Sequence, residues 1–141
     1  MVTVYNGLKF DTELEAIWAS FFDLAGWQWW YNPVSIDNWQ PDFKVTFPCS
    51  HSECGGSHTL LVSVVATDDI KSMSKHPSLS HSFEVRDEQQ KIVADGGALL
   101  GLSPSISKWE IAHGSGGGLE DIFFRVQNAN ELWQKAVASI K

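Results

Sequence analysis

A continuous apolar run in the middle of the chain constrains the fold more than any other feature. The segment Leu60-Leu61-Val62-Ser63-Val64-Val65-Ala66 carries aliphatic or β-branched side chains at nearly every position, not only at alternate ones. Such a strand is apolar on both faces, which is typical of a strand buried in the centre of a sheet. We therefore expect residues 60–66 to form a central strand.

Two amphipathic helices are predicted, one near each end of the chain. The first covers about residues 11–25, where Thr12 and Glu15 form a capping-box pattern and Gly26 follows as a stop signal. The second covers about residues 130–140. Both helices place apolar side chains at helical spacing on one face. These residues are Leu14, Ile17, Trp18, Phe21 and Ala25 in the first helix, and Leu132, Trp133, Ala136, Val137 and Ile140 in the second.

Aromatic and β-branched segments between the helices predict further strands. A short helix or turn capped by Asp68 or Asp69 is expected to run through Met73. The expected strands are residues 27–31, 42–47, 83–85, 91–94 and 98–102, together with a hairpin that pairs 109–112 with 122–126. The fold class is therefore α/β (α+β), with a mixed central β-sheet flanked by an N-terminal and a C-terminal helix.

Length and composition favour one globular domain over residues 1–141. The chain has 141 residues, of which 43% are hydrophobic, and no linker or repeat divides it. No apolar run is long enough to span a bilayer, and the N-terminus lacks the pattern of a signal peptide. We therefore expect a cytoplasmic protein that does not contact membranes, with Cys49 and Cys54 reduced.

The charge balance argues against broad, non-specific binding to duplex DNA. The net charge is −7, from 17 acidic and 10 basic residues. Proteins that hold duplex DNA without sequence preference usually present a basic surface. Any contact with nucleic acid is therefore expected to be local, or there is none.

Several motifs in the first half of the chain follow one order: a helix, an aromatic strand, a strand that opens with Pro-Asp-Phe, a loop, and an apolar strand. The residues are Tyr5-Asn6-Gly7, Phe10, Leu14-Glu15-Ala16, Trp18-Ala19, Phe21-Phe22-Asp23, Tyr31, Pro33 and Pro41-Asp42-Phe43. This pattern, over about residues 5–67, resembles small phage and mobile-element proteins of the PD-(D/E)XK, restriction-endonuclease-like, nuclease superfamily. The resemblance implies a restriction-endonuclease-like fold.

The resemblance also implies a metal site, which this chain matches only in part. In that family the helix Glu, the Asp of Pro-Asp-Phe and a Glu-x-Lys on the next strand hold a divalent metal and position a water. Glu15 and Asp42 occupy the first two places, but the Glu-x-Lys should fall at Ser63-Val64-Val65, which supplies neither a strong ligand nor a positive charge. The arginines that usually flank the helix Glu are replaced by Glu13 and Ile17.

Two residues downstream offer a relocated site, and Glu15 has a structural alternative. Asp69-Ile70-Lys71 spells Asp-x-Lys, but a shift of three to six residues moves a side chain by roughly 10–20 Å along a strand. A turn cap at Asp69 and a solvated Lys71 are therefore favoured. Glu15, in turn, can complete the capping box with Thr12 without any metal.

A short loop gathers the thiol and imidazole groups that commonly bind zinc. Cys49, His51, Cys54 and His58 lie within ten residues, and Gly55-Gly56 would let the backbone turn tightly around an ion. The spacing matches no standard zinc motif, so a structural zinc site and a metal-free reduced loop both stay open. Four protein ligands would fill the coordination sphere of zinc and make its role structural.

These observations predict a catalytically degenerate nuclease-like protein of a mobile element that acts by binding nucleic acid or a protein partner. The first alternative is an active Mg²⁺-dependent endonuclease that uses Glu15, Asp42 and relocated Asp69 and Lys71. The second is a zinc-stabilised, non-enzymatic adaptor or inhibitor. The seven tryptophans are assigned mainly to core packing and not to base stacking.

Overall fold

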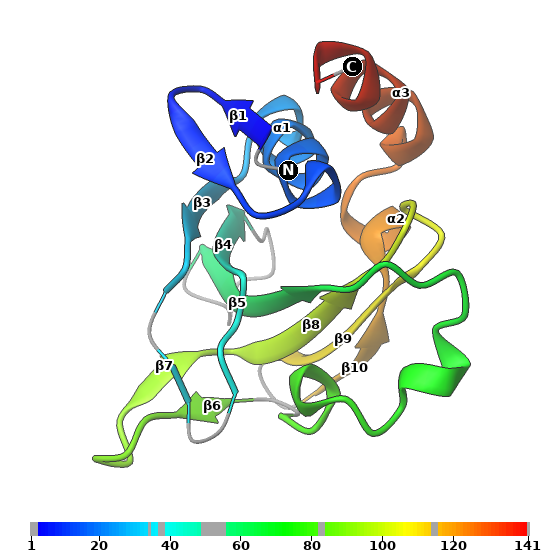
Figure 1. The fold of residues 1–141 in the computed structure, drawn as a ribbon. Coiled ribbons are helices and arrows are strands. Elements are labelled where there is room, and N and C mark those ends of the chain that lie inside the picture. The colour runs from blue at the N-terminus through cyan, green and yellow to red at the C-terminus, as the bar shows by residue number, and fades with distance from the viewer. Residues whose placement is uncertain are drawn as a thin grey trace.

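The chain folds around a six-stranded mixed sheet, as a computed structural model shows for residues 3–33, 35–36, 39–48, 56–81, 84–113 and 116–140 (Figure 1). The α+β class and the mixed central sheet predicted from the sequence are confirmed. The elements are β1 Thr3–Tyr5, β2 Leu8–Phe10, α1 Glu13–Ala25, β3 Gln28–Tyr31, β4 Phe43–Pro48, β5 Ser57–Val64, η1 Lys71–Met73, η2 Pro77–Leu79, β6 Val85–Arg86, β7 Ile92–Ala94, β8 Gly96–Leu100, β9 Ser107–His113, β10 Gly116–Glu120, α2 Ile122–Arg125 and α3 Ala129–Ile140.

Strand β5 lies inside the sheet, as its apolar run predicted. The strand order is β10-β9-β8-β5-β4-β3, and β5 pairs antiparallel with β4 but parallel with β8. Leu60 and Val62 belong to the larger of two hydrophobic clusters, whereas Leu61 belongs to the smaller one. Side chains of a strand alternate between faces, so the two clusters lie on opposite faces of the sheet.

Both long helices lie on the same face of the sheet and pack against each other (Figure 1). The larger cluster joins them to the sheet through Trp18 and Phe22 of α1 and through Ala136 of α3. The sequence pattern showed that each helix has one apolar face but not which face of the sheet it covers. Within the described residues, no helix is both long and apolar enough to cross a membrane.

The opposite face is covered by the 3-10 turn η2 and the short β6–β7 sheet (Figure 1). A glycine lets this layer approach, because a Cβ atom at Gly97 would collide with the backbone oxygen of Ser78. The amide of Gly97 also donates a hydrogen bond to the carbonyl of His81, at 3.2 Å, in this layer. The smaller hydrophobic cluster lies on this side and consists of Ile36, Trp39, Leu61, Val85 and Ala94.

The start and end of α1 follow the sequence signals. Thr12 is the N-cap, its hydroxyl accepts from the amide of Glu15, and the Glu15 carboxylate accepts from the amide of Thr12. Gly26 ends the helix in the left-handed region with φ of 79°. The capping-box prediction is therefore confirmed.

The predicted pairing of 109–112 with 122–126 is wrong. Strand β9 pairs instead with β10, which begins at Gly116, and residues 122–125 form the short helix α2. The Asp121 carboxylate caps this helix by accepting from the amide of Phe124. The sequence prediction gave the apolar run 122–126 more weight than the helix-capping signal of Asp121, and it read the glycines as a turn.

A hairpin at the N-terminus was not predicted as secondary structure. Strands β1 and β2 are joined by Asn6 and Gly7, whose φ values are 51° and 80°. Asn-Gly favours the two-residue turn in which both residues have positive φ, so this dipeptide was the available signal. The hairpin packs against α1.

Candidate functional site

The structure brings Glu15 and Asp42 together. Glu15 lies in the first turn of α1, and Asp42 immediately precedes β4. Their carboxyl groups are close enough for each to shift the pKa of the other, and Glu15 is only 5% exposed. Residues from a helix start and a strand start therefore form one carboxyl pair, with Glu15 buried and Asp42 partly buried, which we call the Glu15–Asp42 pair.

Protein donors surround this pair. Glu15 Oε1 accepts from the amide and hydroxyl of Thr12, at 3.1 and 3.2 Å, and from the Tyr31 hydroxyl at 3.1 Å. Asp42 Oδ2 accepts from the amide of Val64 at 2.8 Å. The motif match contained Tyr31 without giving it a role. Its position in β3 directs the hydroxyl to Glu15 and the amide of Asp11.

Burial and mutual repulsion favour a shared proton in the pair. Burial raises the pKa of Glu15, and the charge of Asp42 raises it further. Burial also raises the pKa of Asp42, to which the charge of Asp11 adds. Burial and then the nearby Glu15 raise the pKa of Tyr31 to about 12, so its hydroxyl remains a donor at neutral pH. Carboxyls this close titrate as a unit.

The third place of the family site is apolar on the side that faces the pair. Val62 and Val64 of β5 point into the cluster that contains α1. Ser63 points to the opposite face, where its hydroxyl accepts from Trp39 Nε1 at 2.8 Å. The motif match therefore assigned the Glu-x-Lys to residues 63 and 65, which point away from α1. The residues of β5 that point toward α1 are Val62 and Val64.

These surroundings do not fit a Mg²⁺ site. Magnesium takes near-octahedral oxygen ligands and usually keeps several waters. Here the two carboxyls accept hydrogen bonds from Thr12, Tyr31 and Val64. Val62 and Val64 of the neighbouring strand belong to the apolar cluster and offer no ligand. Within the described ranges, no group of three or more His, Cys, Asp or Glu side chains is arranged to hold a metal.

Among the described residues, neither Asp69 nor Lys71 makes a hydrogen bond or ion pair with Glu15 or Asp42. Asp69 is exposed, and its Oδ1 accepts from the amide of Lys71 at 3.1 Å at the start of η1. Lys71 is also exposed. The carboxyls whose charges act on the pair are its own members and Asp11. Asp69 therefore makes a local bond to the Lys71 amide, but the N-cap of η1 is Ile70, which has no side-chain cap.

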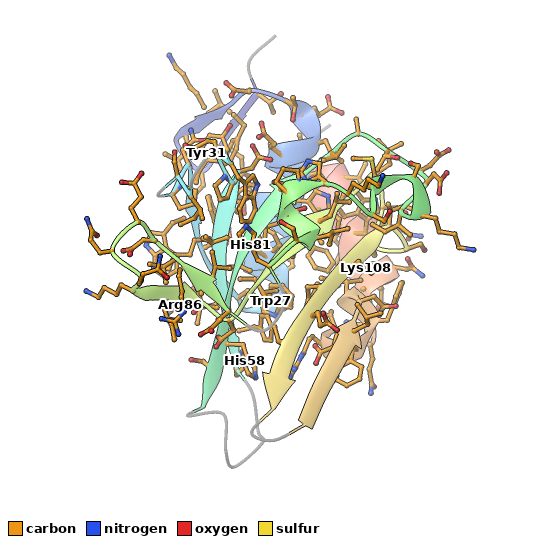
Figure 2. The ribbon with its side chains drawn as sticks, turned by 90° about the horizontal axis from the view of Figure 1, so that it is seen from below. Trp27, Tyr31, His58, His81, Arg86 and Lys108 are labelled. Atoms are coloured by element: carbon orange, nitrogen blue, oxygen red, sulfur yellow. The ribbon has the colours of Figure 1, made fainter. Side chains whose placement is uncertain are left out.

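The proposed zinc ligands fall mostly outside the described residues. Cys49, His51 and Cys54 lie there, whereas His58 lies on β5 and is 4% exposed (Figure 2). Its Nδ1 is 3.5 Å from Asp95 Oδ2, which also accepts from the amide of Thr59. Zinc binding by this loop stays a prediction.

Most tryptophans belong to the core, as the sequence predicted. Trp18, Trp27, Trp39 and Trp109 are at most 6% exposed. Trp30 on the edge strand β3 differs, because it is 47% exposed and carries Lys44 Nζ at 4.8 Å from its ring centroid. Only this tryptophan, among those in the described ranges, offers a large surface to a partner.

Comparisons with protein-family models, with curated proteins and with solved structures found no match for this chain.

Asp42→Asn should raise the free energy of unfolding at pH 7 by on the order of 1 kcal/mol, because an amide keeps an acceptor for Val64 and can donate to Glu15 without a second charge. Both carboxyls have raised pKa values in the folded chain. The pair's contribution is therefore fully present below the unfolded pKa and is lost as pH rises through the folded pKa.

Urea unfolding of both proteins between pH 4 and pH 8 measures this difference. The gain from Asp42→Asn should grow with pH across that range. Asp87→Asn is the matched control, since Asp87 is only partly buried in the β6–β7 turn and bonds its own loop amides. A loss of stability at pH 7 in Asp42→Asn alone would mean that the pair is stable in its doubly ionised form.

Proposed function

We propose that the chain is a catalytically degenerate, restriction-endonuclease-like domain of a mobile element that acts by binding a partner. One observation carries the proposal. The Glu15–Asp42 pair occupies the first two places of the family site, yet it binds the chain's own donors and faces Val62 and Val64 where a charged pair would complete the site. This geometry supports a retained scaffold without the parts that activate water.

The order of elements supports the family part of the proposal. Helix α1 and strands β3, β4 and β5 follow one another as the motifs in residues 5–67 imply. The three strands are neighbours in the sheet, and the ends of α1 and β4 bring the two motif carboxyls into contact. A chance motif match would not be expected to place these carboxyls side by side.

The charge distribution favours a protein partner over a phosphate backbone. The net charge is −7. Both arginines of the chain pair with carboxylates, Arg86 with Glu84 at 3.0 Å and Arg125 with Glu120 at 2.8 Å. Arginine is the side chain best suited to bidentate phosphate recognition, and here both are engaged.

A nuclease assay tests the proposal. Purified protein, stripped with chelator and supplied with Mg²⁺ or Mn²⁺, is incubated with duplex DNA, single-stranded DNA and RNA. The proposal predicts the same background for the wild type and for Asp42→Ala. Cleavage that Asp42→Ala abolishes and Asp87→Ala retains would overturn it in favour of an active metal-dependent nuclease.

A further inference from the structure

An open groove lies between the N-terminal hairpin and the edge strand β3. It has a volume of about 660 Å³ and is lined by Asn6 and Leu8 of the hairpin, by Asp23 of α1, and by residues 27–31. Figure 1 shows β3 at the outer edge of the sheet, next to the β1–β2 hairpin. Leu8 and Trp30 are 44% and 47% exposed. The groove therefore combines accessible apolar surface with a strand edge.

The backbone of β3 offers hydrogen-bonding groups to this groove. β4 is the one neighbour of β3 among the described strands. The amide of Asn32 donates to the carbonyl of Asp42, and antiparallel pairing alternates, so residues 28 and 30 also direct their amides and carbonyls to β4. Trp29 and Tyr31 then direct theirs outward. An edge of this kind can take up a further strand.

The chemistry of the groove favours a basic strand. Asp23 is the one Asp, Glu, Lys or Arg among the lining residues, and its carboxylate accepts from the Tyr5 hydroxyl and from Trp29 Nε1. With a net charge of −7, the chain attracts cationic segments over longer distances.

We propose that the open edge of β3 binds an extended basic segment of a partner protein as an added strand. This inference rests on the proposed binding function and names its surface and partner chemistry. Side chains on one face of the added strand lie on the side of Leu8 and Asp23, where a lysine or arginine is near the carboxylate. Apolar side chains on its other face lie along Trp30, whose ring already carries Lys44. The main-chain bonds to Trp29 and Tyr31 supply affinity, and the acidic groove selects for charge.

A second copy of this chain is a poorer occupant. Pairing two β3 edges would bring together two copies of Asp23 and two chains that each carry −7. The Coulomb term therefore opposes self-association at the same edge where it favours a basic peptide.

Amide hydrogen exchange with a defined probe tests the inference. The probe is a capped peptide that alternates valine and arginine, and its partner probe alternates valine and glutamate. Saturating arginine peptide should slow exchange at Trp29 and Tyr31 by about tenfold or more, the effect of placing an open amide in a strand pair. Exchange at residues 28 and 30, whose amides already face β4, should change much less.

Two charge variants sharpen the result. Asp23→Asn should weaken binding of the arginine peptide about threefold, as expected for one exposed carboxylate. Asp87→Asn changes the net charge equally but lies outside the groove, so it should bind like the wild type. Thermal unfolding of each variant checks that the fold is intact.

Several results would overturn the inference: no binding of the arginine peptide, binding without slower exchange at Trp29 and Tyr31, or equal protection by the glutamate peptide. Protection that rises with protein concentration in the absence of peptide would assign the edge to a second copy instead. None of these outcomes changes the result of the nuclease assay. Conversely, metal-dependent cleavage would refute the proposed function, whereas the exchange experiment would still show whether the β3 edge binds a basic strand.

Discussion

Arg125→Met should lower the free energy of unfolding by about 3 kcal/mol, because it leaves a buried carboxylate without its countercharge. Arg125 Nε and Nη2 donate to the two oxygens of Glu120 at 2.8 and 2.9 Å. The side chains of Arg125 and Glu120 are 12% and 3% exposed. The guanidinium also lies over the ring of Phe47, at 5.0 Å. Methionine fills similar volume but cannot donate.

The matched control for this variant is Arg86→Met. Arg86 pairs with Glu84 at 3.0 Å, but both side chains are 43% exposed. Surface ion pairs typically contribute about 0.2–1 kcal/mol, so this substitution should change stability little. Urea denaturation of the two variants at pH 7 gives the comparison. Equal losses would show that burial does not set the energy of the Arg125–Glu120 pair.

Trp18→Ala should lower the free energy of unfolding by about 3–5 kcal/mol, the usual range for removing a buried tryptophan. Trp18 is fully buried on α1. Its ring lies 5.1 Å from that of Phe21 and 4.5 Å from that of Trp133 in α3, and its Nε1 donates to the carbonyl of Gly101 at 2.9 Å. The variant would lose the contact that joins both helices to the end of β8.

Trp30→Ala is the control for this effect. Trp30 is 47% exposed on the edge strand, so its removal should cost well under 1 kcal/mol, as surface substitutions usually do. Chemical denaturation followed by far-UV circular dichroism applies to both variants. Comparable destabilisation by the two substitutions would contradict the assignment of Trp18 to the core and Trp30 to a binding surface.

Local signals predicted the elements that depend on neighbouring residues. The Thr12–Glu15 capping box and Gly26 bounded α1, and the apolar run at residues 60–66 located β5 in the sheet, although the strand itself begins at Ser57. Helix capping and strand burial act within a few residues, so the sequence displays them directly. The Asn6-Gly7 turn carried an equally local signal for β1–β2.

Long-range arrangement was less accessible. The apolar faces of α1 and α3 predicted burial but not that both helices share one face of the sheet, because periodicity contains no information about the partner surface. The pairing of β9 was assigned to the apolar run 122–126, yet the glycine-rich β10 is the partner. Glycines are poor strand formers, so tertiary context overrode local preference there.

The candidate site combines both kinds of information. The motifs named Glu15 and Asp42, and the structure joins them. The motif match also placed the Glu of the family Glu-x-Lys at Ser63, whose side chain points to Trp39 on the other face of the sheet. A shift of one residue reverses the face of a strand, so only the pairing of Asp42 with β5 could locate Val62 and Val64 beside the carboxyls.

A carbon-13 NMR titration of the side-chain carboxyls of Glu15 and Asp42, with and without Mg²⁺, tests the central claim most directly. We predict coupled titration of the two groups, with one apparent pKa above the ordinary value of about 4 for a carboxyl, and no change on adding Mg²⁺. Ordinary, independent titration of both groups, or a Mg²⁺-dependent fall of the upper pKa, would contradict a pair held by a shared proton in place of a metal.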